Sequence, residues 1–257
     1  MNALLRSLAS STARLLHVRE IAQRAYFRSC DHRVQAGPFR GMNYVTIAHC
    51  SAIAPKLSGS YERELHPCLA QLVAAQPDLF VDVGAAEGYY AVGAAFAKWS
   101  PRVVAYECDP AARATLRDLM ALNHVSTGRV DLREACTPAS LEAVLASAVR
   151  PAAIIDAEGS EALLIDPLRV PSLHRTLLLV EYHDFILPGL SQVLVERMQP
   201  THHFEIIHPA ARQPEELVVA GPLLRRMPRL CQSLLSELRP TSAHGWLWFR
   251  PKSFDLR

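Results

Sequence analysis

The sequence lacks several features that would place it directly in a class of protein. It has no run of about 18 apolar residues, so we expect no membrane span. Its six cysteines form no CxxC pair and no cluster with histidines at zinc-ligand spacing, and we interpret them as reduced thiols of a cytosolic protein. The net charge is only +2, so no strong positive field favours a nucleic acid as partner.

The first 19 residues leave two interpretations open. They contain three arginines and several serines, and the first acidic residue is Glu20. This composition resembles an organellar transit peptide. The interpretation that we favour is an amphipathic helix, whose apolar stripe consists of Leu4, Leu5, Leu8, Leu15 and Leu16. We therefore expect a cytoplasmic protein, with organellar targeting as the alternative.

From residue 79 onward, short apolar segments alternate with stretches of helical pattern. We predict strands at 79–83, 103–106, 130–133, 152–155 and 176–181, separated by helices at 87–98, 110–122 and 140–148. Apolar strands separated by helices are typical of a parallel sheet that is covered on both faces and binds ligands at the carboxyl ends of its strands. The pattern therefore predicts an α/β fold.

Two further strands are predicted at 204–207 and 246–249, with an insertion at about residues 209–240 that contains a helix around 223–238. We predict a main domain over 77–257 and an N-terminal extension over 1–76, which could serve as a lid or as the interface of a homodimer. In the extension, Gly37–Gly41 indicates a turn. Residues 61–75 predict a helix capped by Ser60, in which Pro67 either introduces a kink or starts the main helix at its first turn.

The first predicted strand contains Asp82 near its end and leads through Gly84 and Gly88 into a helix. A glycine at each of these positions lets the backbone turn sharply and lets a ligand approach closely. The spacing differs from the G-x-G-x-x-G of dinucleotide sites, and Glu87 places a negative charge where a pyrophosphate would bind. A cationic or zwitterionic ligand therefore fits this turn better than a diphosphate.

Glu107 lies at the end of the second predicted strand. An acid in this place can accept hydrogen bonds from both hydroxyls of a ribose. Asp109 precedes Pro110, so we expect it to cap the next helix. A strand, a glycine turn, a helix, a second strand and a terminal acid in this order predict a nucleoside site. The alternative is a flavodoxin-like domain that has a tight turn and no nucleoside ligand.

These residues resemble motifs of class I S-adenosylmethionine (SAM)-dependent methyltransferases, and within that class the FkbM-like group. The resemblance rests on residues 81–90, on residues 106–110 and on the motif Asp156-Ala157-Glu158-Gly159-Ser160-Glu161. It implies a Rossmann-like sheet of seven strands, mostly parallel with one antiparallel strand, with helices on both faces and SAM as cofactor. It also implies that the cofactor is bound by Asp82, Gly84, Ala85, Glu87, Gly88, Tyr90, Glu107 and Cys108.

Acidic and imidazole side chains follow the fourth and fifth predicted strands, whose ends are neighbours in a parallel sheet. Methyl transfer to a hydroxyl needs a base, and a histidine suits this role because its ordinary pKa lies near neutrality. We therefore predict four catalytic residues, with His183 as the first candidate for the base and Glu158 as the second: His183, Glu158, Asp156 and Glu181. We expect Glu161 to face solvent on the following helix.

Other roles for these residues remain open from sequence. His183 could hold Asp184 or a backbone carbonyl in place, and Asp156 could contact the cofactor or cap a turn. We predict no metal ligand, although carboxylates beside one imidazole suit a divalent ion. The predicted function is SAM-dependent O-methylation of a small molecule or a glycan. The alternatives are a SAM-fold protein that binds a partner without catalysis and, disfavoured by the glycine spacing, a nucleotide-dependent oxidoreductase.

Overall fold

The structure of the chain is a computed structural model that describes residues 19–219, 224, 226–236 and 243–256. The chain divides into two compact units, one formed by residues 62–210 and 239–257 and the other by residues 1–61 and 211–238. The apolar stripe predicted from Leu4 to Leu16 lies outside the described residues. The roles proposed for the N-terminal extension, as a lid or as a homodimer interface, stay predictions.

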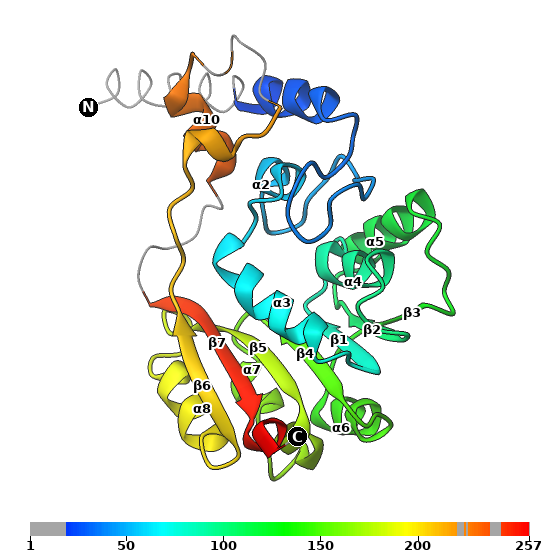
Figure 1. The fold of residues 1–257 in the computed structure, drawn as a ribbon, viewed down its shortest axis with the longest axis vertical. Coiled ribbons are helices and arrows are strands. Elements are labelled where there is room, and N and C mark those ends of the chain that lie inside the picture. The colour runs from blue at the N-terminus through cyan, green and yellow to red at the C-terminus, as the bar shows by residue number, and fades with distance from the viewer. Residues whose placement is uncertain (1–18, 220–223, 225, 237–242, 257) are drawn as a thin grey trace, which may run out of the picture. The chain divides into compact units, whose positions relative to one another are not determined.

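The larger unit is built on a seven-stranded sheet with the order β3-β2-β1-β4-β5-β7-β6. β7 is antiparallel to both of its neighbours, and the pairs among the first five strands are parallel. Figure 1 shows β6 and β7 running in opposite directions at one side of the sheet. This topology confirms the predicted Rossmann-like class I methyltransferase fold. The strands are β1 (Leu79–Val83), β2 (Val103–Tyr106), β3 (Val130–Arg133), β4 (Pro151–Ile155), β5 (Leu177–His183), β6 (His202–Ile207) and β7 (His244–Pro251).

Helices follow the strands in the alternating order that the sequence predicts. The α-helices of this unit are α3 (His66–Ala74), α4 (Tyr89–Phe96), α5 (Pro110–Leu122), α6 (Pro138–Ala146), α7 (Glu161–Leu164) and α8 (Leu190–Met198). Short 3-10 helices are η1 (Arg63–Leu65), η2 (Pro171–Arg175) and η4 (Lys252–Leu256).

Both faces of the sheet are covered, and every residue of β1, β4 and β5 is buried. On one face, residues such as Val81 and Val180 share a core with side chains of α6, α7 and α8. On the other face, Gln71 of α3 accepts a hydrogen bond from Trp248, and the ring of Phe80 packs edge-on against Trp99, just after α4. Burial on both faces explains why β1, β4 and β5 consist mainly of apolar residues.

Two helix starts follow from local capping chemistry. The carboxylate of Asp109 accepts the N–H of Ala111 at 2.9 Å, which confirms the predicted cap of α5. α6 begins two residues earlier than predicted, because Thr137 and Ser140 form a capping box and Pro138 occupies the first turn.

The segment 61–75 differs from the single capped helix that we considered first. The hydroxyl of Ser60 lies 2.7 Å from that of Ser58 and caps no helix. The 3-10 turn η1 comes first, and α3 then begins at His66 with Pro67 in its first turn, which is the alternative interpretation. Glu62, which precedes η1, has a left-handed backbone with φ of 46° and a buried side chain.

The smaller unit contains a helix over residues 19–29, together with α2 (Ile53–Ser58), η3 (Pro214–Glu216) and α10 (Pro228–Leu235). The hydroxyl of Tyr26 donates to the carbonyl of Val218 at 2.6 Å and so joins the first helix to the insertion. The predicted turn at Gly37–Gly41 is present, and an added Cβ on Gly37 would lie 2.5 Å from the Gly59 carbonyl. Of the predicted helix 223–238, α10 covers residues 228–235 with Pro228 at its start, and residues 223, 225, 237 and 238 lie outside the described residues.

None of the described helices is both long and apolar enough to span a bilayer. All six cysteines carry free thiols, as predicted, and three of them are buried: Cys30, Cys68 and Cys231.

Candidate active site

The glycine turn after β1 is shaped by contacts within the protein. Gly84 has φ of 80°, and an added Cβ would lie 1.8 Å from the backbone oxygen of Asp156. Gly88 has φ of 97°, and its added Cβ would meet the side chains of Leu116 and Val92 at less than 3 Å. Both positions therefore require glycine because of backbone conformation and close packing, in addition to any ligand that approaches them.

The turn is tied to β2 by backbone hydrogen bonds. The N–H groups of Gly84 and Ala85 both donate to the carbonyl of Tyr106, at 2.9 and 3.0 Å. Ala85 is buried, whereas Cys108, beyond the end of β2, is exposed. Of these two predicted cofactor residues, Ala85 thus has a structural contact, while Cys108 lies at the surface next to Glu107.

Glu107 accepts two backbone hydrogen bonds where the turn meets the end of β2. Its carboxylate accepts the N–H of Ala86 and the N–H of Asp109, each at 2.7 Å. One bond reaches each oxygen, and a carboxylate offers about four lone-pair sites in total. The acid therefore holds the turn against β2 and retains acceptor capacity for the hydroxyls of a ligand.

Asp82 is buried one residue before the end of β1. Its Oδ2 atom has no hydrogen-bond partner within the described part of the chain. Burial, reinforced by the negative charges of Asp156, Glu107 and Glu62, raises the pKa of Asp82 to about 8, although a hydrogen bond from the Ala91 backbone acts in the opposite direction. A buried carboxyl oxygen without a partner is costly, so this group fits a ligand that brings a donor or a positive charge.

Glu62 is a residue of this region that the sequence did not assign to the site. Tyr90, a predicted cofactor residue in α4, donates its hydroxyl to Glu62, and both side chains are buried. Glu87 is also fully buried, and Gly88 occupies the N-cap position of α4. Buried carboxylates therefore gather around the glycine turn, which makes this region of the site strongly acidic.

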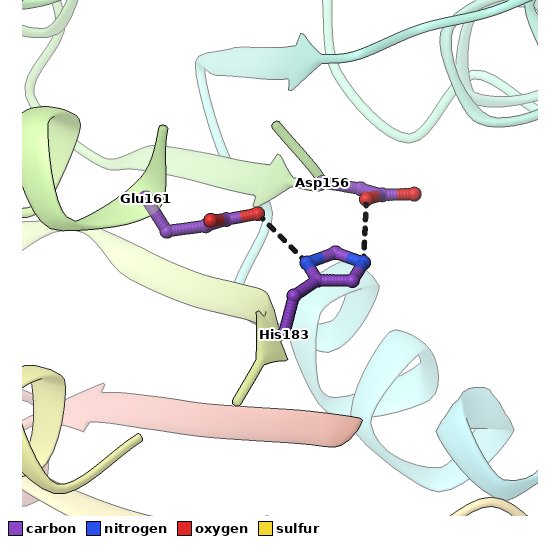
Figure 2. A group of neighbouring side chains, drawn as sticks. All are labelled: Asp156, Glu161 and His183. Carbon is purple, nitrogen blue, oxygen red and sulfur yellow. Dashed lines mark hydrogen bonds and ion pairs between the residues drawn. The ribbon is translucent and has the colours of Figure 1, made fainter. Parts of the chain in front are cut away.

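His183, the last residue of β5, lies between two carboxylates (Figure 2). Its Nδ1 is 3.0 Å from Oε1 of Glu161, and its Nε2 is 3.7 Å from Oδ1 of Asp156. Oε2 of Glu181, two residues earlier in the same strand, lies 3.9 Å from Nε2. The structure thus brings together three of the four predicted catalytic residues and adds Glu161 to them.

Glu161 is completely buried, with a relative exposure of 0%, so the expectation that it faces solvent is wrong. Its Oε1 also accepts the N–H of Ala157 at 3.1 Å, and its Oε2 accepts the N–H of Gly159 at 2.9 Å. The reason is the turn before α7, where Glu158 and Gly159 have φ of 48° and 101° and reverse the chain. Gly159 was the available signal in the sequence, because a glycine there permits this reversal.

The remaining acids of the edge have different environments. Glu158, the second candidate for the base, is exposed, whereas His183 is buried. The carboxylate of Asp184 accepts the N–H of Ser191 at 2.8 Å and its hydroxyl at 2.6 Å, and so ties the loop after β5 to α8. His183 therefore pairs with Glu161, and Asp184 has its own partners.

The pKa of His183 is raised above the ordinary value of 6.5. Burial opposes the charged ring, but the hydrogen bond to Glu161 and the negative charges of Asp156, Glu161 and Glu158 outweigh it. Because Glu161 accepts from backbone N–H groups on both oxygens, it is an acceptor toward Nδ1, which then carries the proton. The lone pair of a neutral His183 is therefore on Nε2.

Asp156, Glu161 and His183 also offer one donor atom each within 4.8 Å of one another, a set that could hold a divalent cation. For Glu161, however, coordination would compete with the hydrogen bonds from Ala157, Gly159 and His183. We therefore interpret the cluster as a hydrogen-bonded imidazole with acidic neighbours.

His202, the first residue of β6, is held by hydrogen bonds within the protein. Nε2 of His202 lies 3.1 Å from the carbonyl of Thr176, and Nδ1 lies 2.8 Å from the Thr201 hydroxyl. Burial lowers the pKa of His202 to about 4, which keeps the ring neutral near pH 7.

Comparison with known proteins gives no family model and no curated protein that matches the sequence. Solved structures similar to this chain include a putative O-methyltransferase from Klebsiella pneumoniae, with 20% identity over 56% of this chain and 72% of that chain and a TM-score of 0.43. An O-methyltransferase from Bacillus cereus, in complex with SAH, shows 11% identity over 90% and 91% of the two chains and a TM-score of 0.46. A precorrin-6y C5,15-methyltransferase from Geobacter metallireducens GS-15 shows 15% identity over 72% and 88%, with a TM-score of 0.45. The resemblance to the FkbM-like group stays a prediction.

Proposed function

We propose that this protein is a SAM-dependent methyltransferase whose cofactor lies at the glycine turn after β1. The observation that carries the proposal is the position of Asp156. Its N–H donates to the carbonyl of Val83 at 2.9 Å, its own carbonyl packs against Gly84, and its carboxylate faces His183. One residue thus joins the candidate cofactor turn to the candidate base.

The acidic surroundings of the turn support a cationic cofactor. SAM carries a sulfonium and an ammonium group and no phosphate, so it can supply positive charge beside Asp82 and hydroxyls to Glu107. Asp82 provides a buried oxygen without a hydrogen-bond partner among the described residues, and Glu107 retains acceptor capacity. A diphosphate would place further negative charge among these buried acids, which is unfavourable.

Bound SAM would supply an activated methyl group, and the residues of the chain would orient and deprotonate the acceptor. The buried Glu161 holds Nδ1 of His183, so the Nε2 lone pair can take the proton of an acceptor hydroxyl. The cofactor would supply the methyl group that the acceptor oxygen takes up, and the proton that the hydroxyl loses would pass to Nε2 of His183. Asp156 and Glu181, at 3.7 and 3.9 Å from Nε2, stabilise the resulting imidazolium.

A hydroxyl acceptor is the choice that this base supports, because a hydroxyl has to lose its proton as the oxygen is methylated. A small molecule or a glycan would both present such a group. We assign His183 the role of base, Glu161 that of a positioning residue, and Asp156 and Glu181 that of electrostatic support.

Calorimetry with SAM tests the cofactor, using the wild type and Glu107→Ala. We expect binding by the wild type and weaker binding by the variant. No binding by the wild type would overturn the proposal, whereas binding that is unchanged in Glu107→Ala would overturn only the role of Glu107 toward the ribose.

Formation of S-adenosylhomocysteine with a panel of phenols, aliphatic alcohols and glycosides tests catalysis. In His183→Ala we expect SAM binding to persist and turnover to fall by about 10²–10⁴-fold, the usual contribution of a general base. Turnover that is insensitive to His183→Ala would refute the base. Binding of SAM without turnover of any acceptor would instead favour a SAM-fold protein that acts by binding a partner.

A further inference from the structure

The loop between β5 and α8 exposes three consecutive apolar side chains, which begin two residues after His183, the candidate base. Phe185, Ile186 and Leu187 have relative exposures of 48%, 47% and 43%. Isolated exposed apolar residues are common, but a run of three is unusual outside a binding surface. We call these three residues the apolar loop.

The apolar loop is held in place by hydrogen bonds at both of its ends. The N–H groups of Ile186 and Leu187 donate to the carbonyl of His183 at 2.9 and 3.0 Å, and that of Phe185 donates to the carbonyl of Ala243 at 3.2 Å. The carboxylate of Asp184 is bonded to Ser191 at the start of α8. The backbone that carries these side chains is therefore anchored before a ligand binds, which lowers the entropic cost of binding.

The apolar loop is continuous with the candidate base. The ring of Phe185 lies edge-on to the ring of His183, with 5.6 Å between the centroids. Ile186 packs over Gly159, since an added Cβ on Gly159 would lie 3.1 Å from the Ile186 Cγ2 atom. Gly159 belongs to the turn that Glu161 stabilises. The same apolar surface thus borders both the imidazole and the turn that positions it.

We propose that the apolar loop binds the methyl acceptor, and that the acceptor is a small molecule whose hydroxyl is attached to an aromatic or aliphatic body. This inference rests on the proposed function and narrows its acceptor class. Where the other hydroxyls of a glycan face these three apolar side chains, they would exchange water for groups that offer no hydrogen bond, which is unfavourable. An apolar body instead removes surface of Phe185, Ile186 and Leu187 from water while its hydroxyl faces His183.

The probe for this proposal is 2-naphthol, which combines one hydroxyl with an apolar ring system, and methyl glucoside is its polar counterpart. Binding is measured by naphthol fluorescence and by the NMR signal of the Ile186 methyl group in protein labelled at isoleucine methyls. The signal is assigned by its loss in Ile186→Val. We expect 2-naphthol to shift this signal and methyl glucoside to leave it unchanged at equal concentration.

The double variant Ile186→Ser/Leu187→Ser is expected to weaken naphthol binding about tenfold, because it removes two of the three apolar side chains of the loop. Both side chains are half-exposed, and a thermal melt checks that the variant is folded. The matched control is Leu168→Ser, which changes an apolar side chain of 93% exposure that lies outside the loop. This control should bind 2-naphthol as the wild type does.

Four results would overturn the proposal. The first is an Ile186 signal that 2-naphthol does not shift, and the second is an equal shift with methyl glucoside. The third is sedimentation of the protein with phosphatidylcholine–phosphatidylglycerol vesicles that is lost in the double variant. The fourth is a dimer that dissociates in the double variant. The last two would assign the apolar loop to a membrane surface or to a second copy. Titration with SAM distinguishes failure of the proposed acceptor site from failure of the proposed function. Naphthol binding at the loop by a protein that binds no SAM would refute the proposed methyltransferase function.

Discussion

Replacing Glu161 by Gln keeps the shape of the side chain and removes its charge. In the wild type, Oε1 accepts from Ala157 and from Nδ1 of His183, and Oε2 accepts from Gly159. One of these oxygens becomes an NH₂ group in Glu161→Gln, and an NH₂ group only donates. In either orientation of the amide, at least one buried N–H group therefore faces a donor.

Leaving a buried N–H without a partner costs about 1–3 kcal/mol. A loss of about 2 kcal/mol corresponds to a drop in Tm of about 4–8 °C for a chain of this size. The pKa of His183 should fall toward its ordinary value, because the hydrogen bond and the charge that raise it are both weakened. A raised histidine pKa stabilises the fold below the unfolded value of 6.5, and this contribution is lost as pH rises through the folded pKa. Glu161→Gln should therefore destabilise the protein more at pH 6 than at pH 9.

The assay is an NMR titration of the His183 ring combined with thermal denaturation at these two pH values. The control is Glu134→Gln, which also removes one negative charge but at a side chain of 82% exposure. With an identified acceptor, the acidic limb of the pH–rate profile should move to lower pH in Glu161→Gln, because the base becomes neutral at a lower pH. An unchanged His183 pKa together with an unchanged Tm would refute the positioning role of Glu161.

Four further predictions concern the turn, the buried acid, the buried histidine and the metal question. Gly84→Ala should lower Tm and abolish SAM binding in calorimetry, because the added Cβ would lie 1.8 Å from a backbone oxygen and the residue has φ of 80°. The control is Gly128→Ala, which should change neither quantity, because its added Cβ would meet only a serine hydroxyl at 3.8 Å. SAM binding at pH 6.5 should release a proton from Asp82, because burial raises the pKa of this carboxyl to about 8 and a cationic ligand favours its charged form. Calorimetry in two buffers of different ionisation enthalpy measures the proton release, which Asp82→Asn should lose. His202 has its pKa lowered to about 4, so its contribution to stability is lost as pH falls from 6.5 toward 4; His202→Gln should remove up to about 3 kcal/mol of this pH dependence in urea unfolding. A chelator should leave methyl transfer unchanged, and activity that EDTA abolishes and Mg²⁺ restores would instead assign Asp156, Glu161 and His183 to a metal.

Much of the scaffold was predictable because it depends on local pattern. The strands at 79–83, 103–106 and 130–133 have the predicted bounds, since each is a short segment that begins with an apolar residue and lies between stretches of helical or turn pattern. The cap at Asp109 was also predictable, because capping involves only residues that are close in sequence. Neighbouring strand ends followed from parallel topology, which places Asp156 and His183 at one edge of the sheet.

Contacts between distant segments were not accessible in this way. The hydrogen bond from Tyr90 to Glu62 joins α4 to a segment 28 residues earlier, and no periodicity marks either residue as its partner. The unpartnered oxygen of Asp82 likewise depends on what packs around β1 from several elements.

The sequence by itself determined the alternation of strands and helices, the glycine turn and the set of acids and imidazole at one edge, because these follow from residue type and spacing. Only the tertiary structure decided that Glu161 turns inward to hold His183, and that Phe185, Ile186 and Leu187 are exposed near this histidine. The physical reason is that burial and pairing of a charged group depend on side chains brought together from β5, α7 and the turn between β4 and α7.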